Sequence, residues 1–201
     1  MRERVEITAI VKGIVETEWK MLQQSESIDN THVPMDAETF FILRSSQIMA
    51  WSTEMQESYY FDVVQAHRDG RNPLKQKYAY LLEQSEPAQF EELYAQLPKR
   101  SAREEEMINQ LCALRIAWRN TLTEQYPRFC AHVFRQTDDR TLETTLRGEM
   151  AACTANTLRL YALYAARLQK DGKNMEEMIL QNAAAQYGYA SLAEAEEKLG
   201  K

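Results

Sequence analysis

The sequence predicts an all-α fold, and three observations lead to that prediction. The chain of 201 residues contains only 6 glycines and 5 prolines, too few for the frequent turns of an all-β protein. Its Ala, Glu, Leu, Gln and Met residues favour helix. Apolar residues recur at spacings of three and four, and no segment alternates as a strand does. We therefore expect one domain, residues 1–201, that folds as a multi-helix bundle.

The first three helices have clear boundaries in the sequence. An apolar stripe from Ile7 to Leu22 is typical of an amphipathic helix, and a polar loop follows at 24–34. Asp36 is placed to cap the second helix. Thr53 and Gln56 have the spacing of a capping box, which predicts that the third helix begins there.

Glycine and proline mark the elements that follow. Gly70 has the position of a residue that ends the third helix, and Asn72-Pro73 is placed to begin a fourth. Pro87 opens a short fifth element that ends near Pro98.

The second half of the chain begins with another capping box, formed by Ser101 and Glu104, and a long helix to Tyr126. Residues 127–140 are less regular, so we expect a loop or one helical turn there. The remaining predicted helices are 141–153, 155–170, one capped by Asn174 and one capped by Ser191.

The two halves share a turn sequence. Asp69-Gly70-Arg71-Asn72 is matched by Asp171-Gly172-Lys173-Asn174, a shift of 171 − 69 = 102 residues. The same shift aligns Tyr59 with Tyr161. This agreement predicts a bundle of two tandem pseudo-symmetric helical repeats, about 1–98 and 101–201, that share one core because each is small. The alternative is that any two helical hairpins with an Asn cap align equally well.

Shifts that differ slightly align further residues. Trp19 falls on Trp118 at a shift of 99, and Arg44 falls on Arg147 at a shift of 103. Small changes of shift are what loop insertions between two repeats produce.

The segment from Phe40 to Trp51 is the most informative part of the chain. It is apolar on every side except for a polar band of four residues, Arg44 to Gln47, at its middle. A buried guanidinium needs carboxylate partners, because an unpaired buried charge is strongly destabilising. The candidate partners of Arg44 are Glu18, Asp36, Glu38 and Glu149.

A matching polar band in the second half contains Glu143, Thr144, Arg147 and Glu149, with Glu143 and Arg147 four residues apart on one helical face. One hypothesis is that the two bands meet at the pseudo-twofold axis and line a pocket. Its two guanidiniums would bind a carboxylate or a phosphate. The competing hypothesis is an ion-pair network that only holds helices in register. The candidate ligand-binding residues are Arg44, Gln47, Glu38, Asp36, Glu18, Glu143, Arg147 and Glu149.

Several other kinds of site lack their residues. His32, His67 and His132 lie far apart, and no Glu-x-x-His occurs, so we expect no metal site. No phosphate-binding glycine loop or nucleophile motif is present, and we expect no cofactor. Three cysteines without a C-x-x-C pair fit buried thiols in a reducing cytoplasm.

Net charge and hydropathy argue against a nucleic-acid partner and against a membrane-bound protein. A net charge of −6 argues against a nucleic-acid partner. Apolar runs are too short to predict a membrane span or a signal peptide. The sequence therefore predicts a soluble cytoplasmic protein.

An ordered set of segments resembles a bacterial family known as domain of unknown function forty-one twenty-five. The segments are Glu18–Met21, Thr39–Trp51, Gly70–Asn72, Leu146–Glu149 and Tyr187–Leu192. The resemblance covers nearly the whole chain and implies an all-helical protein with no established activity. Some members carry this region beside a nucleotidyltransferase-like domain, which implies an accessory role, but this chain has no room for that domain.

One loop departs from the family pattern. The resemblance implies a Gly-Gly pair and a Cys-Gln-Asp run before the second helix, where this chain has Asp29-Asn30-Thr31-His32-Val33-Pro34-Met35-Asp36. The chain keeps Asp36 of that pattern but not the glycines or the cysteine, so the resemblance does not extend to an activity that depends on them.

The functional hypotheses fall into different classes. The first is a non-catalytic protein that binds a protein partner or a small anionic ligand, with a homodimer as one arrangement. The second is an enzyme, with Glu18, Glu38 or Glu149 as acid or base and the arginines Arg44 and Arg147 as anion clamps. The third is an accessory module of a nucleotidyltransferase-like system. No residue is assigned a catalytic role from the sequence.

Overall fold

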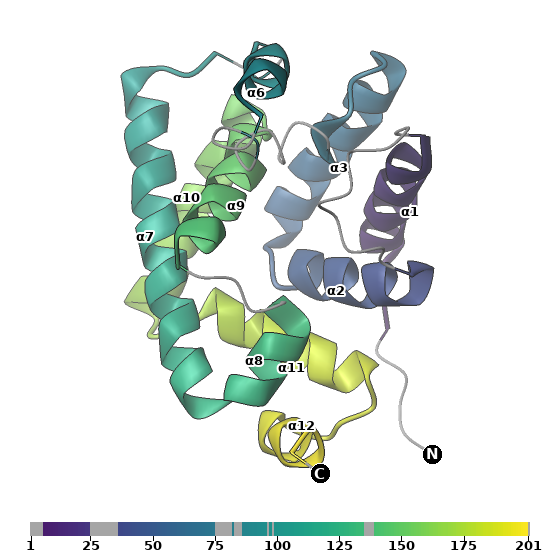
Figure 1. Ribbon diagram of the computed structural model, residues 1–201, viewed down its shortest axis with the longest axis vertical. Coiled ribbons are helices and arrows are strands. Elements are labelled where there is room, and N and C mark those ends of the chain that lie inside the picture. The colour runs from purple at the N-terminus through teal and green to yellow at the C-terminus, as the bar shows by residue number, and fades with distance from the viewer. Residues whose placement is uncertain are drawn as a thin grey trace.

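The computed structural model describes residues 6–24, 36–74, 82, 86–95, 97, 99–134 and 139–200. All regular secondary structure in these ranges is helical, which confirms the all-α prediction (Figure 1). The helices are α1 (Ala9–Gln24), α2 (Ala37–Met49), α3 (Thr53–Arg68), α6 (Pro87–Tyr94), α7 (Ala102–Gln125), α8 (Pro127–Phe134), α9 (Asp139–Ala151), α10 (Ala155–Lys170), α11 (Met175–Gln186) and α12 (Leu192–Lys198).

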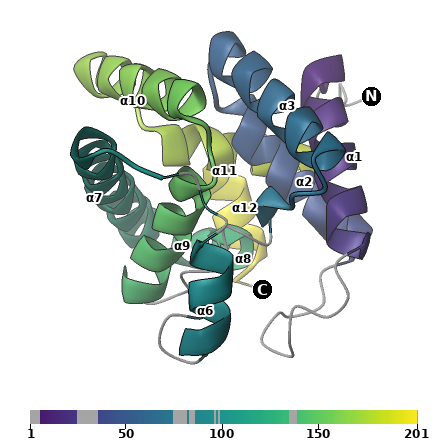
Figure 2. The same cartoon turned by 90° about the horizontal axis from the view of Figure 1, so that it is seen from above.

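Two groups of helices stand on opposite sides of the molecule. Helices α1, α2 and α3 pack together on one side, and α7, α9 and α10 pack together on the other (Figures 1 and 2). Helices α3 and α10 join the two groups, and α11 packs against both α2 and α7. Helices α8 and α12 cover one end beside α11.

The helix starts follow the local sequence in most places. Asp36 accepts the Thr39 amide at 2.8 Å and caps α2, as predicted. Ser101 and Glu104 form the predicted capping box of α7.

The N-cap of the third helix lies one residue before the predicted one. Ser52, not Thr53, is the cap of α3, and its hydroxyl accepts the amide of Met55. The side chain of Gln56 instead donates to the carbonyls of Ile48 and Trp51, both at 3.1 Å. Two adjacent hydroxyl residues can each cap a helix, and these contacts with the preceding turn select the earlier one.

The prediction of a loop or a single turn after residue 127 was wrong in extent, because α8 runs from Pro127 to Phe134. Its first free amides, those of Arg128 and Phe129, donate to the carboxylate of Glu196 at 3.1 and 2.8 Å. The partner that satisfies this helix start therefore comes from α12, far along the chain, and not from a local cap.

The shared turn sequences have matching geometry. Gly70 and Gly172 have φ angles of 68° and 67°, in the left-handed region that glycine tolerates. The Asn72 side chain donates to the carbonyl of Met21 at 3.0 Å, and that of Asn174 donates to the carbonyl of Trp118 at 3.1 Å. These contacts pair Trp118 with Met21, where the sequence comparison paired it with Trp19.

Some expectations fall outside the described residues. These are most of the polar loop at 24–34 and the continuation of the predicted fourth helix through 75–81.

The buried apolar side chains form two cores. The larger core joins α1, α2, α3, α7, α9, α10 and the start of α11, and the smaller one lies among α7, α8, α11 and α12. Fully buried members include Ile14, Met55, Met150 and Leu158 of the larger core and Phe129 of the smaller one.

Candidate functional site

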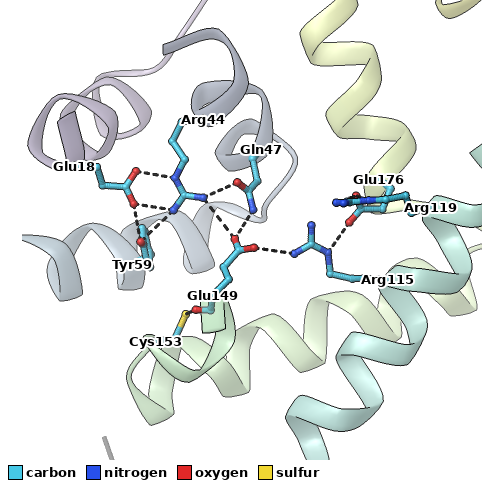
Figure 3. Close-up of polar contacts among 9 residues, drawn as sticks. All are labelled: Glu18, Arg44, Gln47, Tyr59, Arg115, Arg119, Glu149, Cys153 and Glu176. Atoms are coloured by element: carbon cyan, nitrogen blue, oxygen red, sulfur yellow. Dashed lines mark hydrogen bonds and ion pairs between the residues drawn. The ribbon is translucent and has the colours of Figure 1, made fainter. Parts of the chain in front are cut away.

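A chain of buried and partly buried charged side chains links helices from both groups (Figure 3). Acidic and basic groups alternate along it, so that each charge has an opposite neighbour. We call it the central charge network, and its members are Glu18, Arg44, Tyr59, Gln47, Glu149, Arg115, Glu176 and Arg119.

Arg44 of α2 is held by α1 and α3. Its Nε and Nη2 donate to the two carboxylate oxygens of Glu18, both at 2.7 Å. The Tyr59 hydroxyl donates to the same carboxylate at 2.7 Å and accepts from Arg44 at 3.1 Å. Burial lowers the pKa of Arg44, but the charge of Glu18 outweighs it, so the pKa rises well above its ordinary value. Burial and the charge of Glu18 both raise the pKa of Tyr59 well above its ordinary value.

Gln47 and Glu149 join the two halves of the network. The Gln47 side chain accepts from Arg44 Nη1 at 2.6 Å and donates to Glu149 Oε1. Glu149 lies 3.5 Å from Arg44 Nη1 and accepts from Arg115 Nη1 at 3.2 Å. Glu149 is thus shared between two guanidiniums, while Glu18 pairs with one.

The far end of the network lies between α7 and α11. Arg115 Nε donates to Glu176 Oε1 at 2.5 Å, and Arg119 Nη2 donates to Glu176 Oε2 at 2.8 Å. Burial opposes ionisation of Glu176, but Arg115 and Arg119 together hold its pKa below the ordinary value. The Arg119 guanidinium also stacks over the ring of Phe134, 3.9 Å from its centre.

A cavity of about 270 Å³ opens beside the network, and we call it the central cavity. Its polar wall consists of Arg44, Gln47, Arg115, Arg119, Thr145 and Glu149, and its apolar wall consists of Phe40, Leu43, Val133, Phe134, Leu142, Leu146 and Ile179. Five helices therefore contribute to one small space, with charged groups on one side and hydrocarbon on the other.

The three arginines of this cavity differ in how many of their guanidinium nitrogens form hydrogen bonds. The hydrogen bonds of Arg44 occupy all three guanidinium nitrogens. Those of Arg115 occupy Nε and Nη1, and those of Arg119 occupy Nε and Nη2. Within the described part of the chain, Arg115 Nη2 and Arg119 Nη1 have no hydrogen-bond acceptor. Arg115 is only 1% exposed, so its spare donors face the protein interior or the cavity, not bulk water.

The structure brings together four of the eight residues that were predicted as ligand-binding. Glu18, Arg44, Gln47 and Glu149 meet in the central charge network. Ser45 and Ser46, from the same polar band, instead contact Gln186 of α11.

The other four lie elsewhere. Asp36 and Glu38 are exposed at the start of α2, and Glu143 is exposed on α9. Arg147 contacts Glu105 at 3.5 Å and also Asn109, away from Arg44. The expectation that Arg44 and Arg147 face each other is therefore not met, because residues two apart on a helix point in nearly opposite directions, and Glu149 takes the inward one.

Sequence reasoning missed Arg115, Arg119 and Glu176. A signal for Arg115 was present, because it lies four residues after Leu111 and seven before Leu122, both buried on the same face of α7. A charged residue in an apolar helical stripe is the same signal that identified Arg44.

Two other kinds of site are absent from the described residues. No group of three or more His, Cys, Asp or Glu side chains there could hold a metal ion. Among the described helices, none is both long enough and apolar enough to cross a membrane.

Comparison with known proteins gives one family match. The model of a family described as "Protein of unknown function (DUF4125)" matches residues 8–197. No curated protein and no solved structure matches the chain.

Proposed function

The chain belongs to the DUF4125 family, whose description assigns no activity, and we propose from the site itself that the protein binds a small anionic ligand in the central cavity. One observation carries this proposal. Three guanidiniums line the cavity, and two of them, Arg115 and Arg119, keep nitrogens that have no acceptor among the described residues.

The positive charge on the cavity wall favours the binding of an anion. Among the described residues that line the cavity there are three arginines and one carboxylate, Glu149, whereas Glu18 and Glu176 are not part of the lining. An anion in the cavity would therefore meet mainly positive groups. Such contacts are stronger in a partly buried site than at the surface, because water screens them less.

A purely structural role explains one end of the network better than the other. Arg44 is fully bonded and holds α1, α2 and α3 together, as an ion pair that fixes helices would. Arg115 and Arg119 share Glu176, Arg115 also bonds to Glu149, and each of the two keeps one terminal nitrogen without an acceptor among the described residues. An unused buried donor costs stability unless another acceptor is bound. That difference favours a binding site at the α7 end.

We also propose that the fold consists of two tandem repeats and that the cavity lies between them. The residues of α2 that line the cavity are Phe40, Leu43, Arg44 and Gln47, and those of α9 are Leu142, Thr145, Leu146 and Glu149. Each member of the first set lies 102 residues before its counterpart in the second. The same shift relates the two matching turns at Gly70 and Gly172, which supports a pseudo-twofold relation.

Thermal unfolding in the presence of single anions tests the binding proposal. A ligand at about 100 times its Kd stabilises the folded state by about 2.7 kcal/mol. For a chain of this size that corresponds to a rise of roughly 5 to 11 °C in Tm. The anions are phosphate, sulfate, acetate and phenylacetate at constant ionic strength.

Two arginine variants make the test specific. In Arg119→Gln the cavity loses one guanidinium, whereas Arg159→Gln removes an exposed arginine of α10 and serves as the control. We expect at least one anion to raise the Tm of the wild type and the control but not that of Arg119→Gln. The proposal fails if no anion raises the Tm, or if Arg119→Gln responds as the wild type does.

A further inference from the structure

We infer that the ligand of the central cavity is a small monocarboxylate with a compact apolar tail. This inference rests on the proposed anion-binding function and adds the chemical class of the ligand. It is argued from the free donors, from the charge balance and from the apolar wall.

The free donors fit a carboxylate head group. Arg115 and Arg119 lie four residues apart on α7, so their side chains share one face of the helix. Each keeps one terminal nitrogen unbonded within the described residues, Nη2 in Arg115 and Nη1 in Arg119. Two donor nitrogens match the two oxygens of a carboxylate.

Among anions, the charge balance favours one that carries a single negative charge. The network holds three arginines and three glutamates, so its buried charges already cancel. Glu149 faces the same cavity and repels any anion that enters it. That repulsion, like the cost of desolvation, is larger for a dianion such as phosphate than for a carboxylate.

The apolar wall fits a hydrocarbon tail. Phe40, Leu43, Val133, Phe134 and Leu142 are among seven apolar side chains that line the cavity. Thr145 supplies the one hydroxyl among the described lining residues, and it already donates to the carbonyl of Thr141 at 2.8 Å. A cavity of about 150 Å³ encloses one benzene, so one of about 270 Å³ takes roughly eleven non-hydrogen atoms.

Isothermal titration calorimetry of the full chain tests the ligand class with four probes. Phenylacetate has both the carboxylate and a tail of suitable size. Acetate lacks the tail, 2-phenylethanol lacks the charge, and phosphate is a polar anion. We expect phenylacetate to bind about tenfold more tightly than each of the other three, and this preference to weaken about tenfold or more in Arg119→Gln.

A variant that fills the cavity provides an independent readout. Thr145→Phe places a ring in the cavity, and Thr121→Phe is the matched control, because Thr121 is exposed on α7 and its hydroxyl also donates to the carbonyl four residues earlier. We expect Thr145→Phe to lose phenylacetate binding and Thr121→Phe to keep it.

The outcomes separate the two proposals. If phosphate or acetate binds as tightly as phenylacetate, and Arg119→Gln abolishes that binding, the cavity binds anions but the inferred ligand class is wrong. If 2-phenylethanol binds as tightly as phenylacetate, the cavity is an apolar site and both proposals fail. Both also fail if no probe binds and Thr145→Phe folds with a higher Tm, because the cavity is then a packing defect.

Discussion

Replacement of Arg44 by methionine removes the charge at the best-bonded point of the network. The methionine side chain is apolar and keeps much of the length, so the main loss is the guanidinium. Glu18 is only 1% exposed and loses both of its 2.7 Å contacts with Arg44. Its one remaining contact among those described is the Tyr59 hydroxyl.

The expected loss of stability follows from the burial of Glu18. Breaking a buried ion pair by removing one partner costs about 3 to 5 kcal/mol, because the other charge stays buried without compensation. For a chain of this size that loss lowers Tm by roughly 6 to 20 °C. Thermal unfolding followed by circular dichroism at about pH 7 measures the change directly.

A double variant identifies the cause of the loss. When Glu18→Gln is added to Arg44→Met, the buried carboxylate that caused the loss is gone, so the double variant should be more stable than Arg44→Met alone. An Arg44→Met protein with an unchanged Tm would refute the reasoning. So would a double variant whose loss equals the sum of the two single losses.

Three further predictions follow from the burial of single groups. Tyr59→Phe should lower the free energy of unfolding by about 1.5 to 3 kcal/mol, because the hydroxyl bonds to a charged carboxylate. Tyr161→Phe should leave it unchanged or raise it, since the buried Tyr161 hydroxyl has no hydrogen-bond partner within the described residues. Chemical denaturation measures both changes. The pKa of Glu176 is lower in the folded state than in the unfolded state. Its ionised carboxylate therefore contributes to the stability of the fold above about pH 4.3, and this contribution is lost as pH falls through the folded-state pKa. Glu176→Gln should therefore be less stable than the wild type at pH 7 and lose less stability on acidification, as Tm measured from about pH 6 to pH 3 will show. Burial raises the pKa of each cysteine thiol, to about 11 in two of them. Native protein at pH 8 should therefore resist alkylation by iodoacetamide and react fully once unfolded. Rapid labelling of the native protein would contradict the structure. The cysteines are Cys112, Cys130 and Cys153.

Local signals in the sequence were sufficient for the fold class and for most helix boundaries. Caps such as Asp36 and Ser101 act within three residues of their own position, so their effect can be predicted without the tertiary structure. The start of α8 could not be predicted in this way, because its amides are satisfied by Glu196, which is 67 residues away from Phe129.

The candidate site could be predicted only in part. Arg44 stands in an apolar helix, and its need for carboxylates correctly brought Glu18 and Glu149 into the set of candidates. The sequence could not show which of four acidic residues fold against it, since these contacts span 26 and 105 positions.

The prediction that Arg147 supplies the second guanidinium of the site was wrong for a different reason. Aligning Arg44 with Arg147 relied on residue identity, whereas the direction of a side chain is set by its place on the helix. Arg115 holds the inward position on α7, and the same apolar-stripe criterion that identified Arg44 would have found it.

The most direct test of the account is to observe the side-chain NMR signals of Arg115 and Arg119 while phenylacetate is added. The account predicts that the Nε–Hε resonances of both residues shift together and saturate, while that of the exposed Arg159 stays in place. Unchanged resonances of Arg115 and Arg119, or an equal shift of all three, would contradict the claim that the central cavity binds an anion through these two arginines.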